Sequence, residues 1–213
     1  MMKINRDLEN YILRNIDEED NVLQELTRET FLKTVHPRMV SGHLQGLVLT
    51  MISKMIRPRN ILEVGTFTGY SAICLAKGLQ KGGRLHTIEI VDELHSFSSR
   101  YFKKAGISES IVQYSGSALD IIPALPGPFD LVFLDADKRE YCTYYDLVFD
   151  KVPSGGYILA DNILWGGKVI DPPEVSDAQT QGIIEFNEKI RNAPGIEKVI
   201  LPIRDGIVII RKK

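Results

Sequence analysis

The chain has few of the residues that cross-link a protein or bind soft metal ions. Its 213 residues include only 2 cysteines and 4 histidines, too few for a disulfide framework. The histidines show no paired spacing that would indicate ligation or catalysis. Cys74 and Cys142 stand in stretches with a helical pattern and lack the spacing of metal ligands. We therefore expect two reduced thiols in a cytoplasmic protein.

Long apolar runs and an excess of positive charge are also absent. No window approaches the ~18 to 20 apolar residues of a membrane-spanning helix, and the opening MMKINRDLEN contains no apolar signal-peptide core. The formal net charge of −2 gives no general attraction to nucleic acid. We expect neither a membrane nor a nucleic acid as a partner.

What the chain does have is the composition of a globular protein, with 44% hydrophobic and 25% charged residues. Residues 4–35 and 41–56 carry apolar side chains at helical spacing. No linker rich in glycine and serine follows them. We predict a single domain over residues 1–213, in which a helical segment, residues 1–56, packs on an α/β core, residues 57–213.

From residue 60 onward, short apolar runs alternate with helical stretches, which is typical of a mostly parallel sheet covered by helices on both faces. Ligands bind such sheets outside the carboxyl ends of the strands. The predicted strands are 61–64, 84–90, 110–115, 131–135 and 156–161, followed by a closing β-hairpin of 196–203 and 205–213. The predicted helices are 70–80, 92–105, 117–122, 138–150 and 177–192.

A loop with two glycines follows the first predicted strand, in ILEVGTFTGYS. Gly65 permits a tight turn and the close approach of a ligand. Phe67 stands where a dinucleotide fingerprint needs its second glycine, and no Gly-Lys-Ser/Thr follows. An NAD-dependent dehydrogenase and a phosphate-binding P-loop are therefore disfavoured. An ordinary turn explains Gly65 and Gly69 equally well.

Carboxylates and small residues at the strand ends favour a nucleoside ligand. Glu63, inside an otherwise apolar strand, suits a cationic or amine-bearing ligand. Glu89 ends the second strand, where a carboxylate can accept hydrogen bonds from two ribose hydroxyls. Gly116, Ser117 and Ala118 follow the third strand and are placed to line an adenine pocket. A nucleoside with an amino-acid tail and no phosphate indicates S-adenosylmethionine.

Two consecutive strands end on oxygen-bearing side chains, in LVFLDADK and LADN. The carboxylates of Asp135 and Asp161 and the amide oxygen of Asn162 form a set that suits Mg²⁺, Mn²⁺ or Ca²⁺. Lys138 is a candidate general base, because its neutral form is favoured beside a divalent cation. Helix caps, Asx turns and a solvated lysine are the alternative interpretations.

Other catalytic and metal motifs fail at particular positions. The stretch DADKREYCTYYD is not an EF-hand loop, because Glu140 stands where that loop requires glycine and Asp146 where it requires glutamate. Ser71 and Ser117 lack a nucleophile-elbow context, which argues against a serine hydrolase.

Five ordered motifs together make the chain similar to a known family. EVGTFTGYS, IEI, LVFLDADK, ADNILWGG and LPIRDGIVIIRK resemble the cation-dependent O-methyltransferases of caffeoyl-CoA and catechol type, from about Met39 to the C-terminus. The resemblance implies the Rossmann-like class I methyltransferase fold, with a seven-stranded sheet whose last hairpin makes one strand antiparallel. It also suggests a homodimer, because such enzymes are commonly dimeric.

The resemblance assigns roles to individual residues. The metal ligands fall on Asp135, Asp161 and Asn162, the catalytic lysine falls on Lys138, and a tryptophan beside the acceptor ring falls on Trp165. Asp135 and Asn162 join Lys138 as predicted catalytic residues. The predicted residues that bind S-adenosylmethionine are Ser41, Glu63, Gly65, Thr66, Ser71, Glu89, Ser117, Ala118, Asp135 and Asp137.

The chain departs from the family pattern in two places. Ala136 stands where the catechol enzymes carry a histidine, as it does in caffeoyl-CoA types. The stretch SDAQTQGII lacks the tyrosines that contact the acceptor in plant enzymes. The second difference weakens the case for caffeoyl-CoA as the acceptor, and it leaves the chemistry unchanged.

The resulting hypothesis is methyl transfer to one hydroxyl of a catechol-like (vicinal diphenol) small molecule. A divalent cation, Mg²⁺ before Mn²⁺ or Ca²⁺, would bind both hydroxyls and acidify one of them, and Lys138 would take the proton. The alternatives are an N- or C-methyltransferase of the same fold without metal chemistry, and a non-catalytic protein that binds S-adenosylmethionine.

Overall fold

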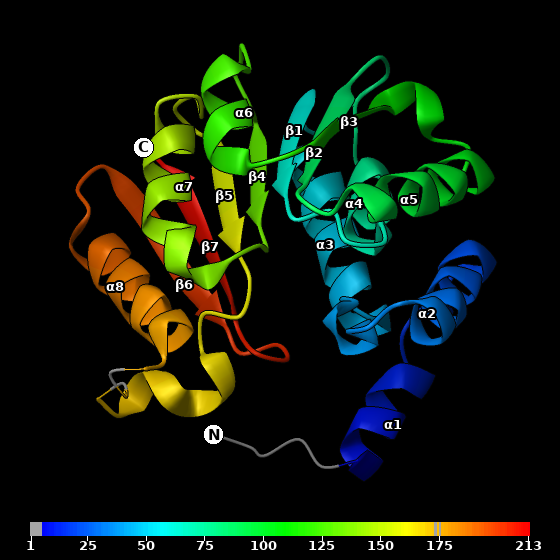
Figure 1. The fold of residues 1–213 in the computed structure, drawn as a ribbon, viewed down its shortest axis with the longest axis horizontal. Coiled ribbons are helices and arrows are strands. Elements are labelled where there is room, and N and C mark those ends of the chain that lie inside the picture. The colour runs from blue at the N-terminus through cyan, green and yellow to red at the C-terminus, as the bar shows by residue number, and fades with distance from the viewer. Residues whose placement is uncertain (1–5, 173, 175) are drawn as a thin grey trace.

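The fold is built around one mixed sheet (Figure 1). A computed structural model of the protein describes residues 6–172, 174 and 176–213. The seven strands lie in the order β3-β2-β1-β4-β5-β7-β6, and β7 runs antiparallel to both of its neighbours while the other pairs are parallel. The strands are β1 (Asn60–Val64), β2 (Arg84–Glu89), β3 (Ile111–Ser115), β4 (Leu131–Leu134), β5 (Tyr157–Ala160), β6 (Ile196–Leu201) and β7 (Ile207–Lys212). The predicted sheet and its C-terminal hairpin are confirmed.

Helices cover both faces of this sheet (Figure 1). One face packs against α6, α7 and α8, and the other packs against α2, α3, α4 and α5. The α-helices are α1 (Arg6–Arg14), α2 (Asn21–Lys33), α3 (His43–Ile56), α4 (Tyr70–Ala76), α5 (Asp92–Lys104), α6 (Ala118–Ala124), α7 (Tyr141–Phe149) and α8 (Ala178–Asn192). The short 3₁₀ helices are η1 (Pro37–Met39), η2 (Ser108–Ser110), η3 (Lys138–Glu140) and η4 (Trp165–Ile170). No helix in the described ranges is long and apolar enough to cross a membrane.

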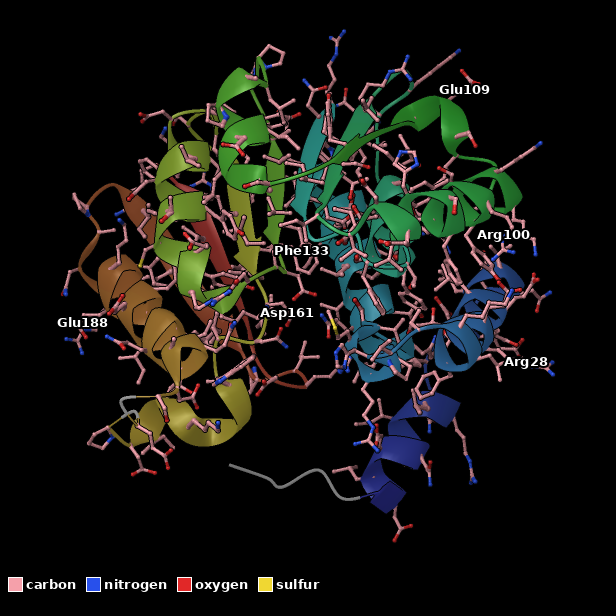
Figure 2. All side chains as sticks on the ribbon, viewed as in Figure 1. Arg28, Arg100, Glu109, Phe133, Asp161 and Glu188 are labelled. Carbon is pink, nitrogen blue, oxygen red and sulfur yellow. The ribbon has the colours of Figure 1, made fainter. Side chains whose placement is uncertain are left out.

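The central strand β4 explains why both faces are covered. Successive side chains of a strand point to opposite faces, and all four residues of β4 are fully buried. Leu131 and Phe133 join the core under α3 and α4, whereas Val132 and Leu134 join the core under α6 and α7. Phe133 lies in the middle of the molecule in Figure 2. Asp135, the residue that follows β4, is the first one outside this buried stretch.

The helical region before β1 agrees with the prediction that residues 4–35 are helical and precede a separate helix over 41–56. The described part of it forms two helices, α1 and α2, with a break over residues 15–20. The acidic run in this break ends on Asp20, whose carboxylate accepts a hydrogen bond from the Val22 amide at 2.9 Å and caps α2. Residues 4 and 5 of the predicted helix lie outside the described residues. Leu23 and Leu26 of α2 are buried in the core below the sheet.

Two predicted helices of the core are shorter or tighter than expected. The helix predicted for 70–80 ends at Ala76. Gly78 then lies so close to α3 that a Cβ there would be 2.2 Å from the backbone carbon of Ser53. The helix predicted for 138–150 starts with the 3₁₀ turn η3, because the Asp137 carboxylate caps this turn by accepting from the Arg139 amide at 3.1 Å. The first five strands match their predicted bounds to within a residue.

The ends of β1 and β4 touch at Gly65. The Asp135 amide donates to the carbonyl of Val64 at 2.9 Å, which continues the pairing of the two strands past their ends. Gly65 has φ +102°, and a Cβ on it would lie 2.0 Å from the carbonyl oxygen of Asp135. Only glycine fits this position. The contact brings the glycine-containing loop against the residue that ends β4.

We predict that Gly65→Ala destabilises the protein more than Gly82→Ala does. Gly82 also has a positive φ, +77°, but no atom within 4 Å of an added Cβ. The control should therefore cost about 1–2 kcal/mol for backbone strain alone. Gly65→Ala adds a clash with the backbone of Asp135, worth a further ~1–3 kcal/mol. Urea unfolding of both variants measures the difference, and equal losses would contradict the close approach.

Candidate active site

A pocket of about 1020 Å³ lies at the carboxyl ends of β1, β2, β4 and β5. Binding pockets of single small ligands span ~300 to 1,000 Å³, so this one has room for a cofactor and an acceptor together. All predicted site residues except Glu63 line it. These are Ser41, Gly65, Thr66, Ser71, Glu89, Ser117, Ala118, Asp135, Asp137, Lys138, Asp161, Asn162 and Trp165.

The sheet itself brings Asp135 and Asp161 together. In the parallel pairing of β4 and β5, Leu134 stands opposite Ala160. Each strand ends with that residue, and each is followed by an aspartate. The Asp161 amide donates to the carbonyl of Leu134 at 3.0 Å, so the two carboxylates leave neighbouring strands at the same level.

Glu89 is held rigidly at the end of β2. Its Oε2 accepts a hydrogen bond from the Phe67 amide at 2.7 Å, and its Oε1 accepts one from the Val91 amide at 2.9 Å. Phe67 adopts a φ of 48°, a left-handed conformation that is uncommon for a large side chain. The glycine-containing loop is thus fastened to the Glu89 carboxylate, which lines the pocket with a fixed orientation.

Glu63 is the exception among the predicted site residues, because it lies behind the pocket wall. Its side chain is 0% exposed, and its Oε2 accepts from the Thr87 hydroxyl at 2.6 Å, whereas Oε1 has no partner within the described structure. Burial raises the pKa of Glu63 to about 8, against the opposing effect of hydrogen bonds from Thr87 and Ser71. Near neutral pH the group is mostly protonated. A direct contact between an ionised Glu63 and a cationic ligand does not follow from this geometry.

Asp135, Asp161 and Asn162 all line this pocket, at the ends of the paired strands β4 and β5. Asp161 is 3% exposed, and burial, followed by repulsion from Asp135, raises its pKa to about 7. Asn162 has φ 59°, and its side-chain amide makes no hydrogen bond to the described residues. Two repelling carboxylates and a free amide oxygen suit a hard divalent cation. The described residues contain no group of three or more His, Cys, Asp or Glu that could hold a metal, so a cation here depends on the amide.

Lys138 is buried beside these carboxylates. Its side chain is 7% exposed, and its Nζ donates to Asp135 Oδ1 at 2.9 Å and to the hydroxyl of Tyr141 at 2.7 Å. The Tyr141 hydroxyl lies 3.0 Å from the carbonyl of Leu134 and 3.1 Å from that of Asp161. Complete burial raises the pKa of Tyr141 well above its usual value. Tyr141 therefore stays a neutral phenol that orients the lysine.

The sequence interpretation missed Gln45 and Tyr141, which hold the predicted residues in place. Gln45, on α3, is 1% exposed. Its Nε2 donates to Asp161 Oδ2 at 2.5 Å, and its Oε1 lies 3.4 Å from Nη1 of Arg204. Gln45 gave no distinct signal, because the buried residues of α3 also include the polar Thr50 and Ser53. For Tyr141 the only sequence signal was its position, three residues after Lys138.

Asp137 has protein partners of its own. Its carboxylate pairs with the Arg139 guanidinium, with Nε at 2.9 and 3.0 Å, and accepts from Gln179 Nε2 at 3.0 Å. The hydrogen bond from Arg139 holds the pKa of Asp137 below its usual range. Asp137 is thus an ionised carboxylate fixed at the pocket edge, and Arg139 and Gln179 are the residues that fix it.

Comparison with known proteins gives the family. A sequence model of a family described as O-methyltransferase matches residues 14–213. The chain is 32% identical over 205 residues to a caffeoyl-CoA O-methyltransferase of Medicago sativa, covering 91% of this chain and 83% of that protein. It is also 32% identical over 198 residues to a catechol O-methyltransferase of Niastella koreensis, covering 91% and 89%.

Solved structures agree with this similarity. The O-methyltransferase TomG from Streptomyces achromogenes, in complex with SAM, matches with a TM-score of 0.90 and 29% identity over 97% of this chain and 96% of that one. An O-methyltransferase from Bacillus cereus, in complex with SAH, matches with a TM-score of 0.89 and 28% identity over 97% of each chain.

The chain belongs to this family of S-adenosylmethionine-dependent O-methyltransferases. The resemblance stated from the five sequence motifs is confirmed, and so is the class I methyltransferase fold. Membership of an O-methyltransferase family also decides against the N- or C-methyltransferase alternative. The match to the family model extends over residues 14–213, which includes α2 and α3 as well as the sheet.

We predict that Glu63 makes this O-methyltransferase less stable as the pH rises. Its pKa in the folded protein, about 8, exceeds the ordinary value of 4.5, so the folded state binds the proton more tightly than the unfolded state. The contribution of Glu63 to the free energy of unfolding is therefore largest below pH 4.5, and it is lost as the pH rises to 8. Between pH 5 and 8 the loss is on the order of 3 kcal/mol.

Urea unfolding of the wild type and Glu63→Gln over this pH range, in EDTA, measures the effect. Glutamine has nearly the same shape and does not ionise, so its free energy of unfolding should lack this fall with pH. Parallel pH profiles for the two proteins would show that Glu63 is already ionised in the folded state.

We also predict that Gln45→Leu costs about 1–3 kcal/mol of stability at pH 8, because it leaves Oδ2 of a buried, ionised Asp161 without its donor. Gln80→Leu is the matched control. Gln80 also donates through Nε2, to the carbonyl of Arg57 at 2.6 Å, but it is exposed, and water can replace it. Its loss should stay within about 0.5 kcal/mol. Chemical unfolding of the two variants compares them, and a small effect at Gln45 would argue against a strong bond to Asp161.

Proposed function

We propose that the protein transfers the methyl group of S-adenosylmethionine to one hydroxyl of a catechol-like acceptor, with a divalent cation held by Asp135, Asp161 and Asn162. The observation that carries the proposal is the meeting of these three oxygen donors with Lys138 in one pocket. The printed names of the relatives, a caffeoyl-CoA and a catechol O-methyltransferase, support a phenolic acceptor.

In this proposal S-adenosylmethionine occupies the part of the pocket at the carboxyl ends of β1, β2 and β3. Glu89, fixed by two backbone amides, accepts hydrogen bonds from the ribose hydroxyls, and Gly116, Ser117 and Ala118 surround the adenine. The amino-acid end lies toward a second group of pocket residues, formed by Ser41, Gly65, Thr66, Ser71 and Asp137. The solved SAM and SAH complexes of similar chains support this cofactor.

Lys138 moves the proton in the proposed reaction. A divalent cation, Mg²⁺ in our proposal, supplies positive charge that makes an acceptor hydroxyl easier to deprotonate. Asp135 would be one of the residues that hold this cation, and Lys138, which lies 2.9 Å from it, would take the hydroxyl proton at Nζ. Tyr141 keeps Nζ in place through the 2.7 Å hydrogen bond. The C–O bond then forms as the C–S bond of the sulfonium breaks, and the opposite charges of donor and acceptor neutralise each other.

Trp165 completes the acceptor side. It is half-buried at the pocket and has a φ of 46°, in a loop whose Gly166 amide donates to Asp205 Oδ1 at 2.5 Å. An aromatic ring of the acceptor can pack on its indole. The proposal also includes one methyltransferase domain over residues 1–213, a homodimer and a cytoplasmic location, which stay predictions.

The test is methyl transfer from S-adenosylmethionine to catechol, with Mg²⁺ or with EDTA. We expect EDTA to abolish turnover and Asp161→Ala to reduce kcat/KM by at least about 10²-fold, since removing a charged group that stabilises the transition state typically costs this much. Asp161→Ala should also weaken Mn²⁺ binding, measured by calorimetry without acceptor.

Asp146→Ala is the matched control for this experiment. Asp146 is an exposed aspartate of α7 that pairs with Lys189 at 2.6 Å, outside the pocket. Its removal should leave both activity and Mn²⁺ affinity within about twofold of the wild type, as expected for a surface ion pair. Full activity of the wild type in EDTA would contradict the role of the cation.

A further inference from the structure

The charges around the pocket are unevenly distributed. The strand ends contribute the carboxylates of Glu89, Asp135 and Asp161, which suit a cationic cofactor and a metal ion. The N-terminal segment and the β6–β7 turn contribute two arginines, Arg38 and Arg204. Neither arginine forms an ion pair with any described residue, although both line the pocket.

Arg204 is fixed where it stands. Its Nη1 donates to the carbonyl of Val40 at 3.0 Å and lies 3.4 Å from Gln45 Oε1, while Nε and Nη2 make no hydrogen bond in the described part of the chain. Arg38 precedes Val40 by two residues on η1 and is exposed at the pocket, without a side-chain hydrogen bond there. Arg204 is thus bonded to the segment that carries Arg38, and most donors of the two guanidinium groups make no hydrogen bond to the described residues.

The same turn borders Trp165. The Leu164 amide donates to the carbonyl of Asp205 at 2.9 Å, and a Cβ on Gly206 would lie 2.5 Å from the Leu164 side chain. The loop that carries Trp165 and the turn that carries Arg204 therefore pack directly against each other. An acceptor ring packed on Trp165 would therefore lie on the side of the pocket that carries the turn with Arg204.

The spacing from Arg204 to the proposed metal site is short. Only the side-chain amide of Gln45 separates the Arg204 guanidinium from the Asp161 carboxylate. Arg204 is therefore one side chain away from Asp161, and both residues line the pocket. A catechol with its two hydroxyls toward Asp135 and Asp161 would turn the opposite edge of its ring toward Arg204.

We propose that the natural acceptor is a catechol carrying a carboxylate on the ring edge opposite the reacting hydroxyls, and that Arg204, with Arg38, binds this carboxylate. The inference rests on the proposed function. Guanidinium groups match carboxylates in shape and bind them through two parallel hydrogen bonds. Two arginines that line the pocket also attract anionic acceptors and disfavour cationic ones.

The experiment compares three acceptors that differ in charge: 3,4-dihydroxybenzoate, its methyl ester and dopamine. With Mg²⁺ and S-adenosylmethionine, we expect kcat/KM for the acid to exceed that for the ester by about ten- to a hundredfold, as expected for hydrogen bonds to a charged group. Dopamine should be the poorest of the three. The difference should appear mainly in KM, because the carboxylate is remote from the reacting oxygen, and it should shrink in high salt.

Arginine variants then test the assignment through the ratio of acid to ester, which is measured on one preparation of each protein. Arg204→Gln should bring this ratio close to one, Arg204→Lys should keep part of it, and Arg38→Gln should lower it severalfold. Arg28→Gln is the matched control, since Arg28 is an exposed arginine of α2 far from Asp161 (Figure 2). It should keep the wild-type ratio.

The outcomes separate this inference from the proposed function. If the wild type methylates no catechol in Mg²⁺, the proposed function is wrong. If it methylates acid and ester equally well, or if the preference survives in Arg38→Gln and both Arg204 variants, the carboxylate site is wrong while the function stands. Should Arg204→Gln not fold, the ratios of Arg204→Lys and Arg38→Gln still decide the question.

Discussion

The site depends on the repulsion between two carboxylates that a parallel sheet forces together. Asp135 and Asp161 follow paired residues of β4 and β5, and Asp161 is almost fully buried. Such groups are costly unless positive charge or hydrogen-bond donors compensate for them. Lys138 donates to Asp135, and Gln45 and the backbone amide of Asn162 donate to Asp161. The surrounding helices α3 and α7 thus meet the sheet edge through polar contacts from Gln45 and Tyr141.

Much of this arrangement could be predicted from the sequence, because it follows from strand ends. Short apolar runs such as LVFL are typical of strands buried on both faces, and their alternation with helices indicates a parallel sheet. Parallel strands end at the same edge, which is why Asp135 and Asp161 could be paired without any coordinates. Ser117 and Glu89 followed from the same reasoning at the ends of β3 and β2, and all four line the pocket.

The parts that escaped prediction depend on contacts between distant segments. Gln45 bonds to a residue 116 positions away, and nothing in its own helix specifies that partner. Glu63 was expected at the pocket, but its side chain turns toward Thr87 of the neighbouring strand, and the alternation of a strand buried on both faces does not say which residue faces a ligand.

The position of β7 has a consequence for how the chain reaches this state. β7 is inserted between β5 and β6, and β6 pairs with no other strand. During synthesis, β6 therefore has no partner until the segment after it has left the ribosome, and β5 presents an open edge until then. Open edges of this kind are where unfinished chains associate with one another. Two of the four exposed residues of β6, Glu197 and Lys198, are charged, but the other two, Val199 and Ile200, are apolar and stay exposed even in the finished sheet. The β6–β7 segment is thus the stage of biogenesis at which assistance from a chaperone would matter most.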